Sequence, residues 1–299
     1  MKVSSPDKML YPGDGITKAE VVAHFELVAD RMLSFAAGRP LTLQRFPRGI
    51  EASGFMQKNA SDHFPPSIQR AEVPKREGGV TTYPVVNQAA DIPYLANQNT
   101  LTFHMWTSSA ATPYQPDWMI IDLDPEDGDI AAAREATRAT RAMLNRFDLD
   151  GFVLATGSKG FHVWVSLTSG HDFAAVSLAS RAIAGLAVTE HSDLLTTEFL
   201  KKNREGRVFV DWLRNGPTAT VVVPFSLRPR PGAPVAVPLT WSELPTASPG
   251  DWCIGGLGDR LELDTEVGQF ELPAREIAAA ARKAGVDLDT PHDRFGRNR

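Results

Sequence analysis

One stretch of the sequence, residues 117–167, constrains the fold more than any other. It starts with an apolar run that ends in Asp122-Leu123-Asp124, continues with a helix-forming segment, and ends with two apolar runs joined by a Gly-Ser-Lys-Gly turn. Residues i and i+2 of a β-strand point to the same face, so Asp122 and Asp124 should project together from one strand. The stretch therefore predicts strand, helix and strand, followed by a turn into a further strand that carries His162. That order resembles a βαβ unit, although the tight turn allows the last strand to pair antiparallel.

The rest of the chain predicts a mixed α/β protein with helices flanking a central sheet. Capping boxes, Gly stops and apolar periodicity predict four helices, and runs rich in Val, Thr and aromatic residues between Gly and Pro predict strands. The helices are expected at 17–38, 129–147, 173–188 and 273–285, with a short one near 88–97 and a capping-box helix start at 240–243; the strands are expected from residues 40, 54, 72, 101 and 207. We expect a single catalytic domain with an N-terminal lobe (about 1–100), a catalytic core (about 101–245), a C-terminal helical region (about 246–290) and a frayed tail from Asp287.

Composition limits the location and the partners of the protein. The chain has 299 residues, 42% of them hydrophobic, which is enough for a full core. It contains one cysteine, so an internal disulfide is excluded, and no apolar run reaches the roughly 20 residues that span a bilayer. We therefore expect a cytoplasmic protein with no membrane partner. The formal net charge is −5, but residues 201–230 contain seven Lys and Arg against two Asp and Glu, a local basic stretch that could bind an anionic partner.

Carboxylates at strand ends suggest a divalent metal and a phosphate substrate. Asp122, Asp124 and Asp211, which ends a later apolar run, could hold two hard cations, the arrangement that phosphoryl and nucleotidyl transfer require. The turn at 157–160 could offer backbone N–H groups, a hydroxyl and an ammonium to phosphates. Each motif alone is weak, because most Asp-x-Asp pairs are solvated strand ends and the turn lacks the spacing of a P-loop. Lys8 and Lys18 flank the entry of the first helix and could lie near one another, although two exposed lysines are the more common case. His104, alone in a strand, is more typical of a structural residue.

Taken together, the motifs resemble those of the archaeo-eukaryotic primase superfamily, and more closely the polymerase domain of bacterial ligase D. The resemblance rests on DLD at 122–124, SKGFH at 158–162 and VFVDW at 208–212, and on DKMLYP, TTYPVV and PFSLRPRPGAPVAVPLTWSEL in the same order. It spans residues 6–244. It implies the fold of a primase-polymerase core and a template-dependent nucleotidyltransferase that fills gaps or extends ends in DNA break repair by non-homologous end joining.

The resemblance also implies roles for individual residues. It makes Asp122, Asp124 and Asp211 the ligands of two Mn²⁺ or Mg²⁺ ions, and it implies a preference for manganese and ribonucleotides. It implies that the nucleoside triphosphate is bound by Thr156, Ser158, Lys159, His162 and Arg228, with His104 as a further candidate. It implies that Lys8 and Lys18 bind the 5′-phosphate of gapped or broken DNA and that Phe55 stacks on the DNA.

The sequence departs from the family pattern at three points. Met56 replaces a second stacking phenylalanine, a basic residue is missing near 217–219, and no K-x-D-G motif of an ATP-dependent ligase occurs. We therefore expect a stand-alone polymerase whose ligase and end-binding partners are separate chains. Two alternatives remain open: a non-catalytic scaffold that binds DNA ends, and an unrelated Asp-x-Asp metal-dependent transferase such as a glycosyltransferase.

Overall fold

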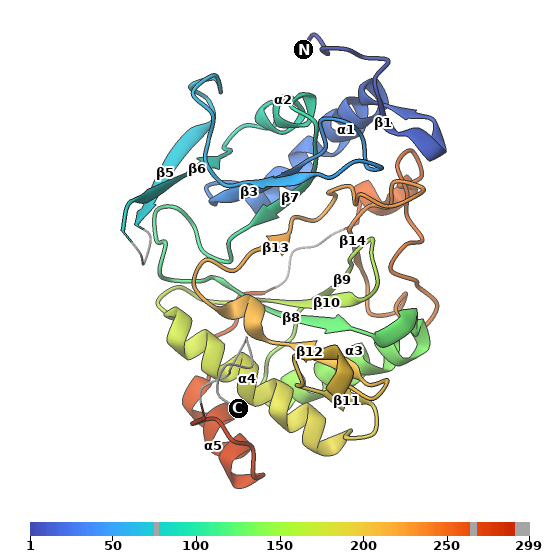
Figure 1. The fold of residues 1–299 in the computed structure, drawn as a ribbon. Helices are drawn as coiled ribbons and strands as arrows, with labels where there is room; N and C mark the ends of the chain where they lie inside the picture. The colour runs from blue at the N-terminus through green and yellow to red at the C-terminus, as the bar shows by residue number, and fades with distance from the viewer. Residues whose placement is uncertain (75–77, 264–267, 291–299) are drawn as a thin grey trace.

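Two β-sheets form the centre of the protein, whose computed structural model describes residues 1–74, 78–263 and 268–290 (Figure 1). The larger sheet has the strand order β11-β12-β8-β10-β9-β14 and the smaller one the order β13-β7-β3-β4. The larger sheet consists of β8 (Trp118–Asp124), β9 (Phe152–Ala155), β10 (Phe161–Ser166), β11 (Leu195–Thr196), β12 (Val208–Asp211) and β14 (Val237–Leu239). The smaller sheet consists of β3 (Leu41–Arg45), β4 (Phe55–Gln57), β7 (Thr100–Met105) and β13 (Val221–Val222), and two separate pairs are β1 (Met9–Tyr11) with β2 (Ile16–Thr17) and β5 (Gln69–Pro74) with β6 (Val80–Val85).

Five α-helices in the described residues cover these sheets. In Figure 1, α3 and α4 lie against the larger sheet with α5 beyond α4, whereas α1 and α2 lie on the side of the smaller sheet. The helices are α1 (Lys18–Ala36), α2 (Asp91–Asn97), α3 (Ile130–Asn145), α4 (Phe173–Glu190) and α5 (Ala274–Lys283). The predicted capping box of α1 is confirmed, because the Thr17 hydroxyl accepts from Glu20 N at 3.3 Å and the Glu20 carboxylate accepts from Thr17 N at 2.8 Å.

The strand order around β8 is a split βαβ unit. β10 pairs antiparallel with both β8 and β9, so β8 and β9 run parallel with β10 between them. The sequence left open whether the strand after the Gly-Ser-Lys-Gly turn pairs antiparallel, and it does. This arrangement places the turn at the same end of the sheet as Asp124.

Alternation along β8 separates a packed face from a functional face. Met119, Ile121 and Leu123 belong to the apolar core under α3 and α4, whereas Ile120 belongs to the core between the two sheets. Asp122 and Asp124 alternate with Ile121 and Leu123 and therefore point away from α3 and α4. The same inter-sheet side is filled farther along by Trp118, Phe152 and Trp164, whose ring centroids lie 5.4–6.0 Å apart.

Helix α4 is a core helix. It is the one helix in the described part of the chain whose length and mean hydropathy would also allow a membrane span. Half of its 18 residues are buried within the protein, however, and it packs against α3, α5 and β8. Its apolar composition is accounted for by these contacts.

The prediction of a helix start at Thr240 was wrong. Residues 241–246 form turns, although the Glu243 carboxylate accepts from Thr240 N at 2.8 Å as a capping box would. Pro245 disfavours the helical conformation of Leu244. Arg260 also binds the Glu243 carboxylate, which fixes the turn instead.

Three other predicted elements differ in extent. The run from Gly54 forms a strand only at 55–57. Pro273 is the N-cap of α5 and not its first helical residue. Residues 287–290 are not frayed, because Arg181 donates to the carbonyls of Asp287, Leu288 and Thr290; the rest of the predicted frayed tail lies outside the described residues.

Candidate active site

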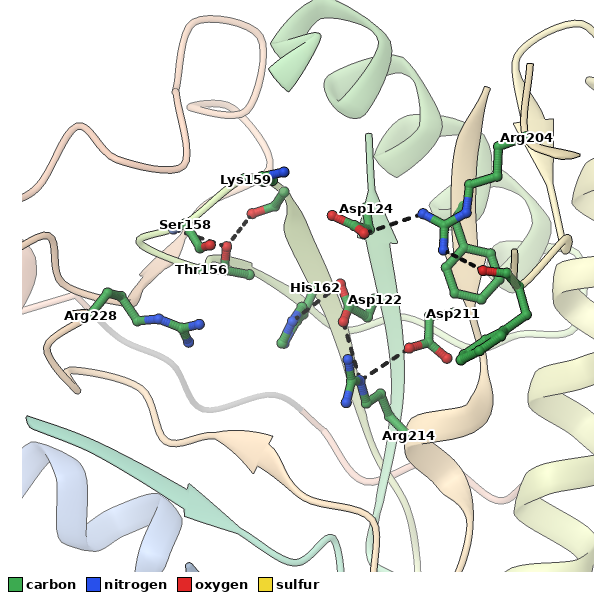
Figure 2. A pocket seen from close by; sticks show the side chains of 13 residues that line it. Asp122, Asp124, Thr156, Ser158, Lys159, His162, Arg204, Asp211, Arg214 and Arg228 are labelled. Atoms are coloured by element: carbon green, nitrogen blue, oxygen red, sulfur yellow. Dashed lines mark hydrogen bonds and ion pairs between the residues drawn. The ribbon is translucent and has the colours of Figure 1, made fainter. Parts of the chain in front are cut away.

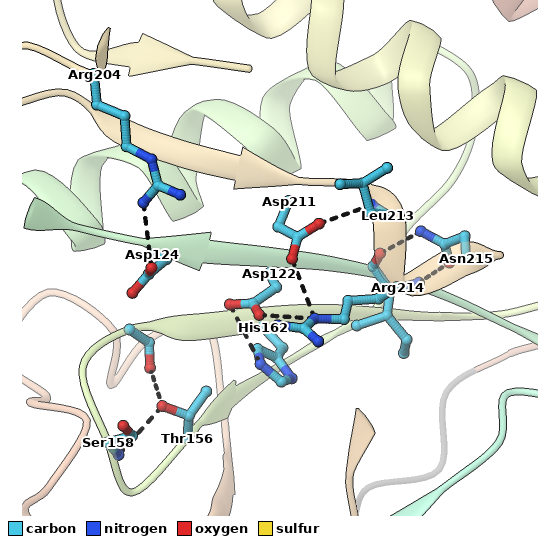
Figure 3. Close-up of polar contacts among 12 residues, drawn as sticks. Asp122, Asp124, Thr156, Ser158, His162, Arg204, Asp211, Leu213, Arg214 and Asn215 are labelled. Atoms are coloured by element: carbon cyan, nitrogen blue, oxygen red, sulfur yellow. Dashed lines mark hydrogen bonds and ion pairs between the residues drawn. The ribbon is translucent and has the colours of Figure 1, made fainter. Parts of the chain in front are cut away.

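Three side chains with functional chemistry lie in a row across three neighbouring strands. Asp122 on β8 pairs with Asp211 on β12 on one side and with His162 on β10 on the other. Directly opposite residues of an antiparallel pair project from the same face of a sheet, and Asp124, two residues along β8, shares that face. The sheet register therefore brings Asp211 together with two carboxylates that are far from it in the sequence (Figure 3).

These side chains line a cavity of about 290 Å³ (Figure 2). Its wall includes every residue predicted from the sequence as a metal ligand, and every predicted nucleotide-binding residue except His104. The full lining is Asp122, Asp124, Thr156, Ser158, Lys159, Gly160, His162, Phe199, Arg204, Phe209, Asp211, Arg214 and Arg228. Acids occupy one side of the cavity, and Lys159 and Arg228 the other.

Two arginines neutralise the carboxylates. Arg214 Nε lies 3.3 Å from Asp122 Oδ2 and 3.2 Å from Asp211 Oδ2, and Arg204 lies 3.4 Å from Asp124. Burial opposes ionisation of Asp122, but His162, at 3.4 Å, and Arg214 outweigh it and hold the pKa of the Asp122 carboxyl below its usual range. Burial and the neighbouring charge of Asp122 raise the pKa of Asp211, which Arg214 offsets only in part.

The donor set fits hard divalent cations. Mg²⁺ and Mn²⁺ prefer carboxylate oxygens, and Asp122, Asp124 and Asp211 present such oxygens on one face of the sheet. Burial, and then the charge of Asp122, raise the pKa of Asp211, so a cation placed beside this carboxylate would favour its ionised form. In the side-chain positions described, no three His, Cys, Asp or Glu residues form a metal-binding group, and Arg214 contacts both Asp122 and Asp211. A divalent ion would therefore compete with this guanidinium for the same oxygens.

The Gly-Ser-Lys-Gly turn is held against the strand that carries the acids. A Cβ added to Gly160 would lie 1.8 Å from the carbonyl oxygen of Leu123, so only glycine permits this approach. Gly157 has a φ of 64°, and its Cβ would lie 2.8 Å from Arg228 Cγ. The Thr156 hydroxyl donates to Gly160 O at 2.7 Å and accepts from Ser158 N at 3.3 Å, which closes the turn. Ser158 and Lys159 are thereby positioned between the acids and Arg228.

Arg228 is a partly buried cation with unused hydrogen-bonding capacity. Its backbone is fixed by Pro234 O at 2.7 Å and by the Tyr11 hydroxyl, which donates to Arg228 O at 3.0 Å. Its Nε is buried and has no hydrogen-bond partner in the described part of the protein. Burial, and then the charge of Arg230, lower the pKa of Arg228 to about 10. A partly buried guanidinium in this state favours an anionic ligand.

His104 does not line the cavity. It lies on β7, and burial together with the charges of Arg228, Arg214 and His162 lowers its pKa to about 3. His104 is therefore neutral at pH 7 and lies close enough to these three side chains to interact electrostatically with them.

Lys8, Lys18 and Phe55 form a second cluster outside this cavity. Lys18 is 3% exposed, its N donates to Lys8 O at 2.7 Å, and burial, Lys8 and Arg45 together lower its pKa. Arg45 also lies 5.5 Å from the ring of Phe55, which is 46% exposed. The two lysines are thus neighbours, as the sequence suggested, and Arg45, which lies near the exposed ring of Phe55, is close enough to Lys18 for its charge to lower the pKa of Lys18.

Two arginines and two phenylalanines of the cavity were missed by sequence reasoning. Arg204 stacks on Phe209 at 4.2 Å and donates to Phe199 O, so these residues form one wall. Arg214 follows Asp211 in a 3₁₀ turn at Leu213–Asn215, which returns its side chain to the carboxylates. The only sequence signal was the basic stretch at 201–230, which contains both arginines.

The fold and the cavity define a protein of the primase-polymerase class, and comparison with known proteins specifies the family. The family described as LigD, primase-polymerase domain, matches residues 17–267. The chain belongs to this LigD primase-polymerase domain family, so the predicted resemblance and the mixed α/β fold are confirmed.

Individual relatives support the same assignment. The chain is 34% identical over 251 residues to the multifunctional non-homologous end joining DNA repair protein LigD of Mycobacterium tuberculosis, and 32% identical over 247 residues to LigD of Mycolicibacterium smegmatis. These matches cover 81% and 82% of this chain but only 33% and 32% of the relatives, so the chain spans about a third of their length. A solved structure of the polymerase domain of M. tuberculosis ligase D in complex with DNA has a TM-score of 0.77 and 29% identity, covering 97% of this chain and 99% of that one.

Proposed function

We propose that the protein is a template-dependent nucleotidyltransferase of the primase-polymerase type that fills gaps or extends ends during DNA break repair. One observation supports this most strongly: Asp211, Asp122 and His162 are aligned across three strands in the same cavity as Lys159 and Arg228. Acids that can hold cations and bases that can hold a triphosphate therefore face one another. The end-joining relatives and the DNA complex of the related polymerase domain support the repair context.

Asp122, Asp124 and Asp211 would hold two divalent ions, Mn²⁺ or Mg²⁺, in this proposal. When bound, such ions neutralise the charge that develops on the attacking and leaving oxygens of an in-line displacement. His162 keeps Asp122 ionised through the contact at 3.4 Å, which keeps that carboxylate ready to bind a cation. We propose manganese and ribonucleotides as the preferred ion and substrate.

The basic side of the cavity would bind the nucleoside triphosphate. Ser158, Lys159 and Arg228 would hold its phosphates, and Thr156 would shape the turn. His104, which lies outside the cavity, would contribute through its electrostatic interaction with Arg228. The oxygen of a primer 3′-hydroxyl then bonds to the α-phosphorus as its proton leaves to solvent, while the bond to the bridging oxygen breaks and its electron pair departs with pyrophosphate. Arg228 would stabilise the departing charge, because its guanidinium lines the cavity and presents planar donors, of which Nε is buried without a partner in the described residues.

The second cluster would bind the DNA on the far side of the gap. Lys8 and Lys18 would hold its 5′-phosphate, since two neighbouring ammonium groups favour a dianion, and Phe55 would stack on a base, a contact worth roughly 1 to 3 kcal/mol. Replacing both lysines by alanine should abolish the preference for a 5′-phosphorylated gap over a 5′-hydroxyl gap; an unchanged preference would refute this role. A cytoplasmic, nucleoid-associated location, with a ligase activity and an end-binding protein acting at the same break, is part of the same proposal.

Primer extension on a gapped duplex tests the proposed function. The expected result is incorporation of templated nucleotides with Mn²⁺, more efficient with ribonucleotides, and its loss in the Asp122→Ala, Asp124→Ala double variant, which should retain DNA binding. DNA binding with no extension in the wild type would favour a non-catalytic scaffold. Sugar transfer from a nucleotide sugar without extension would favour a glycosyltransferase, and full extension by the double variant would refute the site.

A further inference from the structure

A second cavity shares Ser158 and Lys159 with the catalytic cavity. Its volume is about 550 Å³, and it lies between the Gly-Ser-Lys-Gly turn, the start of α3 and the loop at 248–250. Ser158, Ser248, Lys159 and Arg230 contribute its polar side chains, and no carboxylate lines it. The turn at 157–160 therefore separates two cavities, and only one of them contains the carboxylates.

The cations of this second cavity are available to a ligand. Lys159 and Arg230 are exposed, and neither side chain forms an ion pair with a described residue. Two acids next to lining residues, neither of which lines the cavity itself, accept backbone hydrogen bonds: Asp129 accepts from Ala132 N at 2.9 Å and Asp251 accepts from Ser248 N at 2.7 Å. The charged side chains that line this cavity are therefore both cations, in contrast to the acidic side of the catalytic cavity.

The same two chain segments supply cations to both cavities. Arg228 lines the catalytic cavity and Arg230 the second one, and a hydrogen bond of 2.8 Å from Arg230 N to Arg228 O joins them in a tight turn. Lys159 lines both cavities. The charge of Arg230 also lowers the pKa of Arg228, so the two guanidinium groups repel each other and an anion near them would relieve this repulsion.

We propose that the second cavity binds the pyrophosphate released by the reaction and is its exit site. The inference rests on the proposed function, since nucleotidyl transfer releases pyrophosphate next to Lys159 and Arg228. Lys159 contacts the phosphates before and after they leave, and Arg230 with the two serine hydroxyls receives them. No aromatic side chain lines the cavity, so nothing there stacks on a base, which favours a phosphate-only ligand over a nucleotide or a nucleic acid strand.

The proposal is tested by measuring pyrophosphate binding while a nucleotide analogue occupies the catalytic cavity. An α,β-methylene nucleotide analogue, which cannot release pyrophosphate, fills that cavity, and ³¹P NMR then follows the binding of added pyrophosphate. Arg230→Ala should weaken this binding about two- to five-fold, the usual range for an exposed charged contact, and Arg230→Glu should weaken it further. Arg230→Lys should restore most of it, and Arg275→Ala, which removes an exposed arginine on α5, should leave it unchanged.

Extension assays with the same variants complete the test. Arg230→Ala should raise the pyrophosphate concentration needed for product inhibition and leave the KM for the nucleotide unaltered within roughly two-fold. The proposal is overturned if the wild type and Arg230→Glu bind pyrophosphate equally well. It is also overturned if the Arg230 variants weaken DNA binding and leave pyrophosphate binding intact. If the chain extends no primer but Arg230→Glu still loses pyrophosphate binding, the proposed function fails while the anion site stands.

Discussion

Gly160 offers the sharpest test of how the nucleotide turn is held against the acid-bearing strand. In Gly160→Ala the new Cβ would lie 1.8 Å from Leu123 O, 3.0 Å from Leu123 C and 3.1 Å from Pro125 Cδ. An ordinary carbon–oxygen contact is about 3.3 Å, so turn and strand must separate by roughly 1.5 Å. The Cβ is attached directly to the backbone of residue 160, and the atom it meets, Leu123 O, is also backbone. Phe161 pairs with Leu123 in the sheet, so the overlap cannot be relieved by rotating a side chain.

The expected cost follows from this rigidity. Overpacking typically costs 1–3 kcal/mol, and we expect about 3 kcal/mol here, measured as the loss in the free energy of unfolding in urea. Because the turn moves relative to Asp122 and Asp124, nucleotide incorporation should fall about 100-fold, as it does when reacting groups are misplaced by about 1 Å. Gly268→Ala is the matched control, since its Cβ would meet nothing within 4 Å, and it should change stability by less than about 0.5 kcal/mol. A Gly160→Ala protein with wild-type stability and incorporation would refute the close approach.

Two further predictions concern the N-terminal half of the protein. Asn97 accepts from Ser4 N at 3.0 Å and Ser4 Oγ at 3.1 Å, and Ser4 Oγ accepts from Lys18 at 2.7 Å. Asn97→Ala should therefore release Lys18 and reduce the preference for a 5′-phosphorylated gap about three-fold. Incorporation on 5′-hydroxyl gaps should be unchanged. Burial lowers the pKa of His24 to about 4 despite the hydrogen bond between its Nε2 and Phe225 O, so the folded state favours the neutral imidazole. The unfolded chain binds a proton at about pH 6.5, so the folded state loses stability as the pH falls from 6.5 toward 4. Between pH 7 and pH 5 this loss should be about 2 kcal/mol in urea unfolding, and an equal pH dependence in His24→Gln would contradict the assignment.

Local signals in the sequence predicted elements well where the local pattern and the tertiary contacts agree. The Thr17–Glu20 capping box starts α1 as expected, and the residues that follow it, Val21 and Val22 among them, are helical. The same pattern at Thr240–Glu243 fails, because Pro245 prevents the helix and Arg260 binds the Glu243 carboxylate. A capping box is therefore informative only when the next turn can be helical.

The candidate site was predictable in its acids and bases but not in its neutralising residues. Acid pairs at a strand end and a Gly-Ser-Lys-Gly turn are visible in the sequence, and the family resemblance connects them with Asp211. Strand register, which places Asp211 opposite Asp122, and the 3₁₀ turn, which returns Arg214 to both, depend on contacts between distant segments. The second cavity depends on the approach of the 248–250 loop to the turn, for which no local pattern exists.

The most direct measurement is single-turnover incorporation of one nucleotide on a gapped duplex with Mn²⁺ by the wild type and Asp211→Asn. Asparagine keeps the size of the side chain and an oxygen that can accept from Leu213 N, as Asp211 does at 2.8 Å, so the fold and DNA binding should be retained. If Asp211 holds a catalytic ion together with Asp122 and Asp124, the rate should fall at least about 100-fold. A rate within roughly two-fold of the wild type, in a variant of unchanged stability, would contradict the proposed catalytic site.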